Sequence, residues 1–208
     1  MIWLVGAGIV AVGAGAALAA KYLFPNRIPK QEPISARRAK VLEAITAVVP
    51  SQYGDSKFKK IAPGYDPDDP ALPTGFTTCG YLPCYVGSVL GAPKCITQGG
   101  LEQMRTNGRA LGAWVDAGGT NRPKPGDLYA IGTDKLIVHV GVIIDPSGDV
   151  WKTADSGQGA MGSGQSALYV ERSYDPTNVT LAQTKPVLGK PRKLAGWIDI
   201  DKVPGATP

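Results

Sequence analysis

The sequence predicts an α+β fold in which N-terminal helices pack on a small antiparallel sheet, with an apolar helix ahead of them. Apolar residues recur at helical spacing over 35–50 and 78–91. An apolar strand at 136–144 is followed by an Asp-Pro-Ser-Gly-Asp turn and a second strand at 150–155, which indicates an antiparallel hairpin. The 27 glycines and 18 prolines supply many turns and show no collagen-like period.

The first twenty residues contain no charged side chain. As a helix they would extend ~30 Å, which is enough to cross the hydrocarbon core of a bilayer. We therefore expect residues 1–24 to form a membrane anchor, and the basic residues that follow favour the cytoplasmic side for the domain. A cleaved signal segment and an apolar segment buried in a virion stay open as alternatives, although no basic residue precedes the apolar run.

Positive charge is concentrated in the N-terminal part of the chain. Residues 1–62 hold nine Lys/Arg against three Asp/Glu, whereas residues 63–208 hold thirteen against fourteen. We expect 25–62 to be a basic, proline-containing linker with an amphipathic helix that begins after Ser35 and ends before Pro50. The near-neutral balance of 63–208, the expected main domain, lacks the basic surface of a nucleic-acid-binding domain and predicts no nucleic-acid partner.

Cys79 lies at the start of the second predicted helix. Thr78 is a good N-cap, so Cys79 falls in the first turn, where unpaired backbone N–H groups and the helix dipole stabilise a thiolate. Cys84 is the rival nucleophile, because Pro83 at the first helical position would move Cys84 close to the cap. In an oxidising compartment Cys84 could pair with Cys95 and leave Cys79 as a thiol, although three cysteines permit three pairings.

The one histidine of the chain, His139, lies inside the apolar strand 136–144, where a polar ring needs partners. If the turn after this strand has an odd number of residues, His139 pairs with Asp155 on the same face of the sheet. An even turn would instead place Ser156 opposite His139. We favour the odd turn because it gives the imidazole an orienting carboxylate.

Three short segments carry a resemblance to a known family. Thr-Cys-Gly-Tyr opens a helix at 78–81, Pro-Gly-Asp-Leu precedes a strand at 125–128, and His-Val-Gly-Val-Ile precedes a hairpin at 139–143. In this order they resemble the papain-like cysteine amidohydrolases of bacterial cell walls, the NlpC-type peptidases and the related CHAP domains. The likeness is close over about 75–158 and loose over about 35–200.

The resemblance implies a papain-like domain with Cys79 as nucleophile, His139 as base and a polar orienting residue on the following strand. Asp155 is our choice for the orienting residue and Gln158 is second. The implied reaction is hydrolysis of amide bonds in peptidoglycan peptides through an acyl-enzyme, in which the backbone N–H of Cys79 helps to hold the oxyanion. One departure is Thr78, which stands where the family often has Asp or Gln.

These expectations define the cofactors, partners and location of the protein. The reaction needs no organic cofactor, and a chain with one histidine and three cysteines cannot build a multi-histidine or four-cysteine metal site. The partners are a peptidoglycan peptide and, through residues 1–20, a membrane. We expect a membrane-anchored or exported protein of the cell envelope, or a phage virion component.

Two other functions stay open. The first is a catalytically silent scaffold that serves as a virion or membrane-assembly component, and the second is transfer of the acyl group to an acceptor other than water. The reactivity of Cys79 distinguishes the scaffold from the enzyme, because an active thiol alkylates quickly near neutral pH and a buried structural thiol does not.

Overall fold

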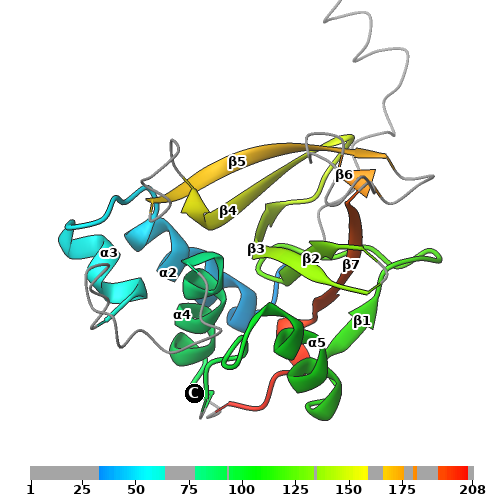
Figure 1. Cartoon of the computed structure of the whole chain (residues 1–208), viewed down its shortest axis with the longest axis horizontal. Helices are drawn as coiled ribbons and strands as arrows, with labels where there is room; N and C mark the ends of the chain where they lie inside the picture. Colours follow the sequence, from blue (N-terminus) through cyan, green and yellow to red (C-terminus); the bar gives the residue numbers. More distant parts are fainter. Residues whose placement is uncertain are drawn as a thin grey trace, which may run out of the picture. The chain divides into compact units, whose positions relative to one another are not determined.

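The computed structural model places helices beside an antiparallel sheet (Figure 1). It describes residues 33–63, 78–92, 94–133, 135–158, 166–175, 180–181 and 192–205. The helices in this part of the chain are α2 (Ala36–Val48), α3 (Ser56–Ile61), α4 (Tyr81–Val89) and α5 (Leu101–Ala110), with 3-10 turns η1 (Thr78–Gly80) and η2 (Ile200–Lys202). The strands are β1 (Trp114–Asp116), β2 (Leu128–Gly132), β3 (Ile137–Asp145), β4 (Val150–Gln158), β5 (Ser166–Asp175), β6 (Thr180–Leu181) and β7 (Lys193–Ile198).

The seven strands form one sheet in the order β1-β7-β2-β3-β4-β5-β6, and every pairing is antiparallel. β6 also pairs with β7, so six of the strands close into a ring. The central strands β2, β3 and β4 are therefore hydrogen-bonded on both edges, which suits a site that needs rigid side chains.

The helix expected after Ser35 is confirmed as α2. The Ser35 hydroxyl accepts a hydrogen bond from the Arg38 amide at 3.2 Å, and the helix ends before Pro50. The fully buried Val41, Ile45 and Val48 form its inner face. α2, α3 and α4 pack together, and α4 lies against β3 and β4 (Figure 1). Residues 34–62 of the expected linker thus belong to the compact unit Ile34–Pro208.

The helix that follows the cysteine starts later than its sequence predicts. Thr78 is not its N-cap: Gly80 is, and Cys79 lies in η1. The reason is tertiary, because Ser156 of β4 accepts a hydrogen bond from the Leu82 amide and donates one to the Cys79 carbonyl. Pro83 is the third residue of α4, within the first turn, where amide groups have no partner inside the helix and the missing N–H costs no helical bond.

The expected fold is corrected in two respects. Among the described helices none is long and apolar enough to cross a membrane, since the longest, α2, has 13 residues and about 20 apolar ones are needed. The predicted transmembrane-like helix at 1–20 lies outside the described residues. The sheet is also not small, because β5, β6 and β7 extend it to seven strands. The described residues thus form an α+β unit in which helices lie beside a closed antiparallel sheet, and none of those helices spans a membrane.

The register between β3 and β4 differs from the predicted one. The observed pairs are Val142 with Ala154, Ile143 with Thr153 and Asp145 with Lys152. The predicted register would pair Asp145 with Asp149, but Asp145 pairs with Lys152, a displacement of three residues. A bulge at Ile144 takes back one of these, so Asp155 lies beside Gly141 instead of opposite His139. A displacement of two residues keeps a side chain on the same face of a strand, and Asp155 therefore still shares the face of His139.

Asp127, from the Pro-Gly-Asp-Leu segment, stabilises the fold through an ion pair and hydrogen bonds. Its buried carboxylate pairs with the buried Arg38 guanidinium at 2.7 Å and accepts hydrogen bonds from the amides of Lys124 and Ile200. Arg38 also pairs at 2.7 Å with two aspartates near the C-terminus, Asp199 and Asp201. This guanidinium joins α2 to the start of β2 and to η2, so the Asp127 carboxylate is used in holding the fold together.

Candidate active site

The structure brings the three predicted site residues together from separate elements. Cys79 lies in η1, His139 near the start of β3 and Asp155 in the second half of β4, and η1 contacts both strands. His139 Nε2 lies 3.4 Å from Asp155 Oδ2, and the same ring interacts with the Cys79 side chain. The imidazole therefore has the thiol as one neighbour and a carboxylate as another.

The backbone of β4 lies directly against the cysteine. Gly157 has a φ of +73°, and a Cβ at this position would lie 2.8 Å from the Thr78 hydroxyl oxygen and 2.9 Å from the Cys79 nitrogen. Glycine is needed here both for the left-handed backbone and for space. The Ser-Gly pair at 156–157 thus lets one strand present Asp155 to His139 and also touch the turn that carries Cys79.

Asp155 is fully buried and has several polar partners. The Tyr129 hydroxyl donates to its Oδ1 at 2.7 Å, and the Arg172 guanidinium pairs with its Oδ2. Arg172 also donates to the Tyr129 oxygen at 3.0 Å. Burial alone would raise the pKa of Asp155, but the contacts with His139, Arg172 and Tyr129 hold that pKa below its ordinary value. The carboxylate therefore stays charged beside the imidazole.

The same surroundings change the titration of His139. Burial disfavours the charged ring, yet the contacts with Asp155 and Cys79 outweigh burial and raise the pKa of His139 from 6.5 to about 9. An imidazolium at neutral pH stabilises a neighbouring thiolate, which is the reactive form of cysteine. Because Nε2 faces Asp155, Nδ1 is the ring nitrogen left to exchange a proton with Cys79.

Gly141 makes room for this arrangement. A Cβ at Gly141 would overlap Asp155 Oδ1 and lie 2.7 Å from Tyr129 Cε1. Tyr129 pairs with Gly141 across β2 and β3, as Ile131 pairs with His139. The glycine of the His-Val-Gly segment therefore leaves the space in which the tyrosine hydroxyl meets the carboxylate.

Sequence reasoning missed Tyr129, Gly141 and Arg172. The first two had a signal, because pairing the strands at 128–131 and 136–144 as a hairpin would place Tyr129 on the face of His139. Arg172 had none. Its position depends on the register of β5 against β4, and no turn motif in the sequence defines that register.

The alternatives left open by the sequence are distinguished by the contacts. Cys84 and Cys95 form a disulfide, with Cα atoms 4.6 Å apart, and Cys79 lies outside it. Cys84 is thus not available as a nucleophile in this state. Gln158 Nε2 lies 3.5 Å from the Ser156 carbonyl oxygen, whereas the carboxylate of Asp155 faces the imidazole.

No protein-family model, curated protein or solved structure matches this chain. Its function must therefore be inferred from the chemistry of the site. What the fold and site define is a thiol beside a carboxylate-paired imidazole, mounted on a turn and two neighbouring strands of an antiparallel sheet. That arrangement can carry out nucleophilic catalysis by cysteine.

The raised pKa of His139 can be measured directly, because the chain has one histidine and hence one set of imidazole signals. We expect an NMR titration of these signals to have its midpoint near pH 9, with the ring protonated below that pH and neutral above it. Asp155→Asn removes the carboxylate and should move the midpoint down toward 6.5.

Asp145→Asn is the matched control for this titration. Asp145 lies at the far end of β3, where its carboxylate accepts a hydrogen bond from the Ser147 amide. We expect its replacement to leave the midpoint of His139 unchanged. An ordinary midpoint in the wild type, or equal midpoints in the wild type and Asp155→Asn, would show that the carboxylate does not act on the ring.

Proposed function

We propose that this chain is a cysteine peptidase or amidase that hydrolyses amide bonds in peptidoglycan peptides through an acyl-enzyme. The observation that carries the proposal is the position of His139, whose ring interacts with the Cys79 side chain and lies 3.4 Å from the buried Asp155 carboxylate. A nucleophile, a base and an orienting group within reach of one another are the requirement of this chemistry.

The proposed reaction starts from a thiolate–imidazolium pair, in which the Cys79 proton is already on His139. The thiolate attacks the amide carbonyl, a C–S bond forms, and the Cys79 backbone N–H helps to hold the oxyanion. His139 then gives its proton to the amide nitrogen as the C–N bond breaks, and the amine leaves. Water, deprotonated by His139, attacks the thioester and releases the carboxylic acid and the Cys79 thiol. Asp155 pairs with the imidazolium each time it forms.

The substrate class is supported by the order of the motifs. A cysteine that precedes a helix, a Pro-Gly-Asp-Leu turn and a His-Val-Gly strand resemble cell-wall amidohydrolases in that order. In this proposal Asp127 of the second motif supports the fold through Arg38, while Cys79 and His139 of the other two do the chemistry. The substrate locates the activity in the cell envelope.

The proposal is tested by digestion of purified peptidoglycan with the full chain, before and after treatment with iodoacetamide. Within the described residues Cys79 is the cysteine that lies outside the disulfide, so we expect one alkyl group per chain, located at Cys79 by peptide mapping. That single modification should abolish the release of soluble peptides. Release that continues after Cys79 is fully alkylated would contradict the mechanism.

The same experiment separates the enzyme from the silent scaffold. A working thiolate reacts with iodoacetamide quickly near neutral pH, whereas a structural thiol that is still protonated there reacts slowly. If the untreated chain releases no peptide and Cys79 alkylates slowly, the scaffold function replaces the hydrolase. Analysis of the products, acid or acyl conjugate, distinguishes hydrolysis from acyl transfer to another acceptor.

A further inference from the structure

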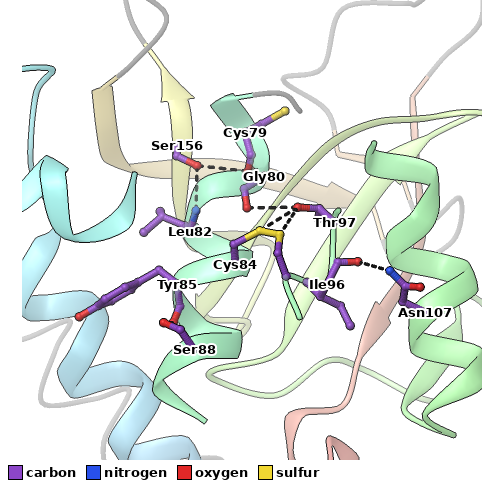
Figure 2. The surroundings of a disulfide bond; sticks show 11 residues. Cys79, Gly80, Leu82, Cys84, Tyr85, Ser88, Ile96, Thr97, Asn107 and Ser156 are labelled. Atoms are coloured by element: carbon purple, nitrogen blue, oxygen red, sulfur yellow. Dashed lines mark hydrogen bonds between the residues drawn. A yellow bond between two sulfur atoms is a disulfide. The ribbon is translucent and has the colours of Figure 1, made fainter. Parts of the chain in front are cut away.

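We propose that Thr97 is a positioning residue for the nucleophile, and that the Cys84–Cys95 disulfide holds Thr97 in place. This inference rests on the proposed role of Cys79. Figure 2 shows the Thr97 hydroxyl between the disulfide and the carbonyl of Gly80, the residue that follows the nucleophile.

The contacts of Thr97 connect these parts directly. Its hydroxyl donates to the Gly80 carbonyl at 3.3 Å and lies 3.2 Å from Cys84 Sγ and 3.3 Å from Cys95 Sγ. The side chain is almost completely buried, with 2% of the residue exposed. A buried hydroxyl with these neighbours has no competing water, so its hydrogen bond to the turn is kept.

Gly80 leaves the space that the Thr97 hydroxyl occupies beside the turn. A Cβ on Gly80 would lie 2.6 Å from the Thr97 hydroxyl oxygen. The φ of Gly80 is −76°, an ordinary value for any residue, so glycine is required here for space and not for conformation. The glycine after the cysteine therefore allows the hydroxyl to reach the backbone of η1.

A second hydroxyl holds the turn at the preceding carbonyl. Ser156 of β4 donates to the Cys79 carbonyl at 3.1 Å and accepts from the Leu82 amide at 3.2 Å. Ser156 holds the Cys79–Gly80 peptide plane, and Thr97 holds the next one, so together they fix the backbone from which the Cys79 side chain projects. Small errors in the position of a nucleophile are costly in rate.

The disulfide restrains the position of Thr97 relative to α4. It ties Cys84 of α4 to Cys95, across a sequence separation of 11, and Thr97 follows two residues later. The next carbonyl along, that of Ile96, accepts a hydrogen bond from the Asn107 side chain of α5 at 2.9 Å. Figure 2 also shows that the Cys79 sulfur points away from the disulfide, so the disulfide acts on the nucleophile through Thr97 and the turn.

The proposal is tested on the full chain with Thr97→Val and Thr97→Ser. Valine keeps the shape and removes the hydroxyl, whereas serine keeps the hydroxyl. We expect Thr97→Val to slow alkylation of Cys79 and to lower kcat about tenfold, with KM unchanged, because the misaligned thiol loses its orientation toward His139. Thr97→Ser should restore both rates. Thr46→Val, which removes an exposed hydroxyl bonded to the Leu42 carbonyl, is the matched control and should behave as wild type.

The double variant Cys84→Ser/Cys95→Ser tests the second half of the proposal. We expect it to slow alkylation of Cys79 as Thr97→Val does, and we expect addition of Thr97→Val to cause little further loss, since both act through one contact. Wild-type alkylation in Thr97→Val, or an equal loss in Thr97→Ser, overturns the proposal. If the wild type cleaves no peptidoglycan, the proposed function fails, and the alkylation rates alone still decide the role of Thr97.

Discussion

Cys79→Ser is expected to lower the release of peptides from peptidoglycan by roughly four orders of magnitude or more, with the fold intact. The hydroxyl of serine is a far weaker nucleophile than a thiolate, and unlike a thiol it does not give up its proton to a neighbouring imidazole before the substrate is attacked. The measurement is the rate of amine release from purified peptidoglycan, with circular dichroism to check folding.

His139→Ala is expected to reduce the rate by a similar factor, because the thiol then lacks both its base and its stabilising cation. Since Cys79 and His139 act as a unit, the double variant Cys79→Ser/His139→Ala should be no slower than either single variant. Ser88→Ala, which removes a hydroxyl at the far end of α4, should keep wild-type activity. Multiplicative losses in the double variant would show that the two side chains act independently.

The parts of the fold that could be predicted are those defined by local pattern. Ser35, the apolar spacing that follows it and Pro50 define α2 within the sequence itself, and the structure agrees. The hairpin of β3 and β4 was likewise visible from its apolar run and its Asp-Pro-Ser-Gly-Asp turn. The pattern left an odd and an even turn open, and we chose the odd one because it gives His139 a carboxylate. The shared face of His139 and Asp155 followed from that choice, although the predicted register was wrong by two residues.

What could not be predicted depends on contacts between distant segments. The start of α4 moved because Ser156 supplies partners for the Cys79 carbonyl and the Leu82 amide, and no local pattern encodes a partner 74 residues away. The hairpin register changed because Asp145 pairs with Lys152 beyond the expected turn and because a bulge occurs at Ile144, and bulges leave only a weak trace in sequence. Arg172 reaches Asp155 through the pairing of β5 with β4, which is set by the whole closed sheet.

The candidate site shows the same division. The residue types that carry chemistry stood out because cysteine and histidine are rare in this chain, at three and one of 208 residues. The residues that hold them did not stand out, since Tyr129, Thr97 and Ser156 are ordinary until their partners are known. A buried carboxylate needs hydrogen-bond donors or a counter-ion. The prediction of Asp155 as the orienting group therefore implied that such donors exist, but the sequence did not identify them.

Arg38→Met is expected to have the largest effect on stability, lowering the free energy of unfolding by about 3–5 kcal/mol near neutral pH. Arg38 and Asp127 have side chains that are 3% and 1% exposed and lie 2.7 Å apart. Loss of the guanidinium leaves Asp127 buried without its counter-ion and removes the link from α2 to Asp199 and Asp201. Arg109→Met is the control, because the Arg109–Asp116 pair is exposed and worth at most about 1 kcal/mol.

The effect of Arg38→Met should depend on pH in a defined direction. Burial raises the pKa of Asp127 from 3.8 to about 6 even though Arg38 opposes the shift. Between pH 3.8 and about pH 6 the native state therefore binds more protons than the unfolded state. The stability that protonation of Asp127 contributes is fully present below pH 3.8 and is lost as the pH rises through about 6. In Arg38→Met the pKa of Asp127 rises further, because Arg38 is one of the groups that lower it. At acid pH the Asp127 carboxyl is then neutral, and a neutral carboxyl needs no counter-ion.

Urea unfolding of wild type, Arg38→Met and Arg109→Met at about pH 4 and at about pH 7 measures this dependence. We expect the loss in Arg38→Met to be large at neutral pH and clearly smaller at acid pH, where Asp127 is protonated. The loss in Arg109→Met should be small at both. An Arg38→Met loss that is the same at both values would mean that the ion pair with Asp127 is not what Arg38 contributes, and that its hydrogen bond to the Pro125 carbonyl and its packing matter more.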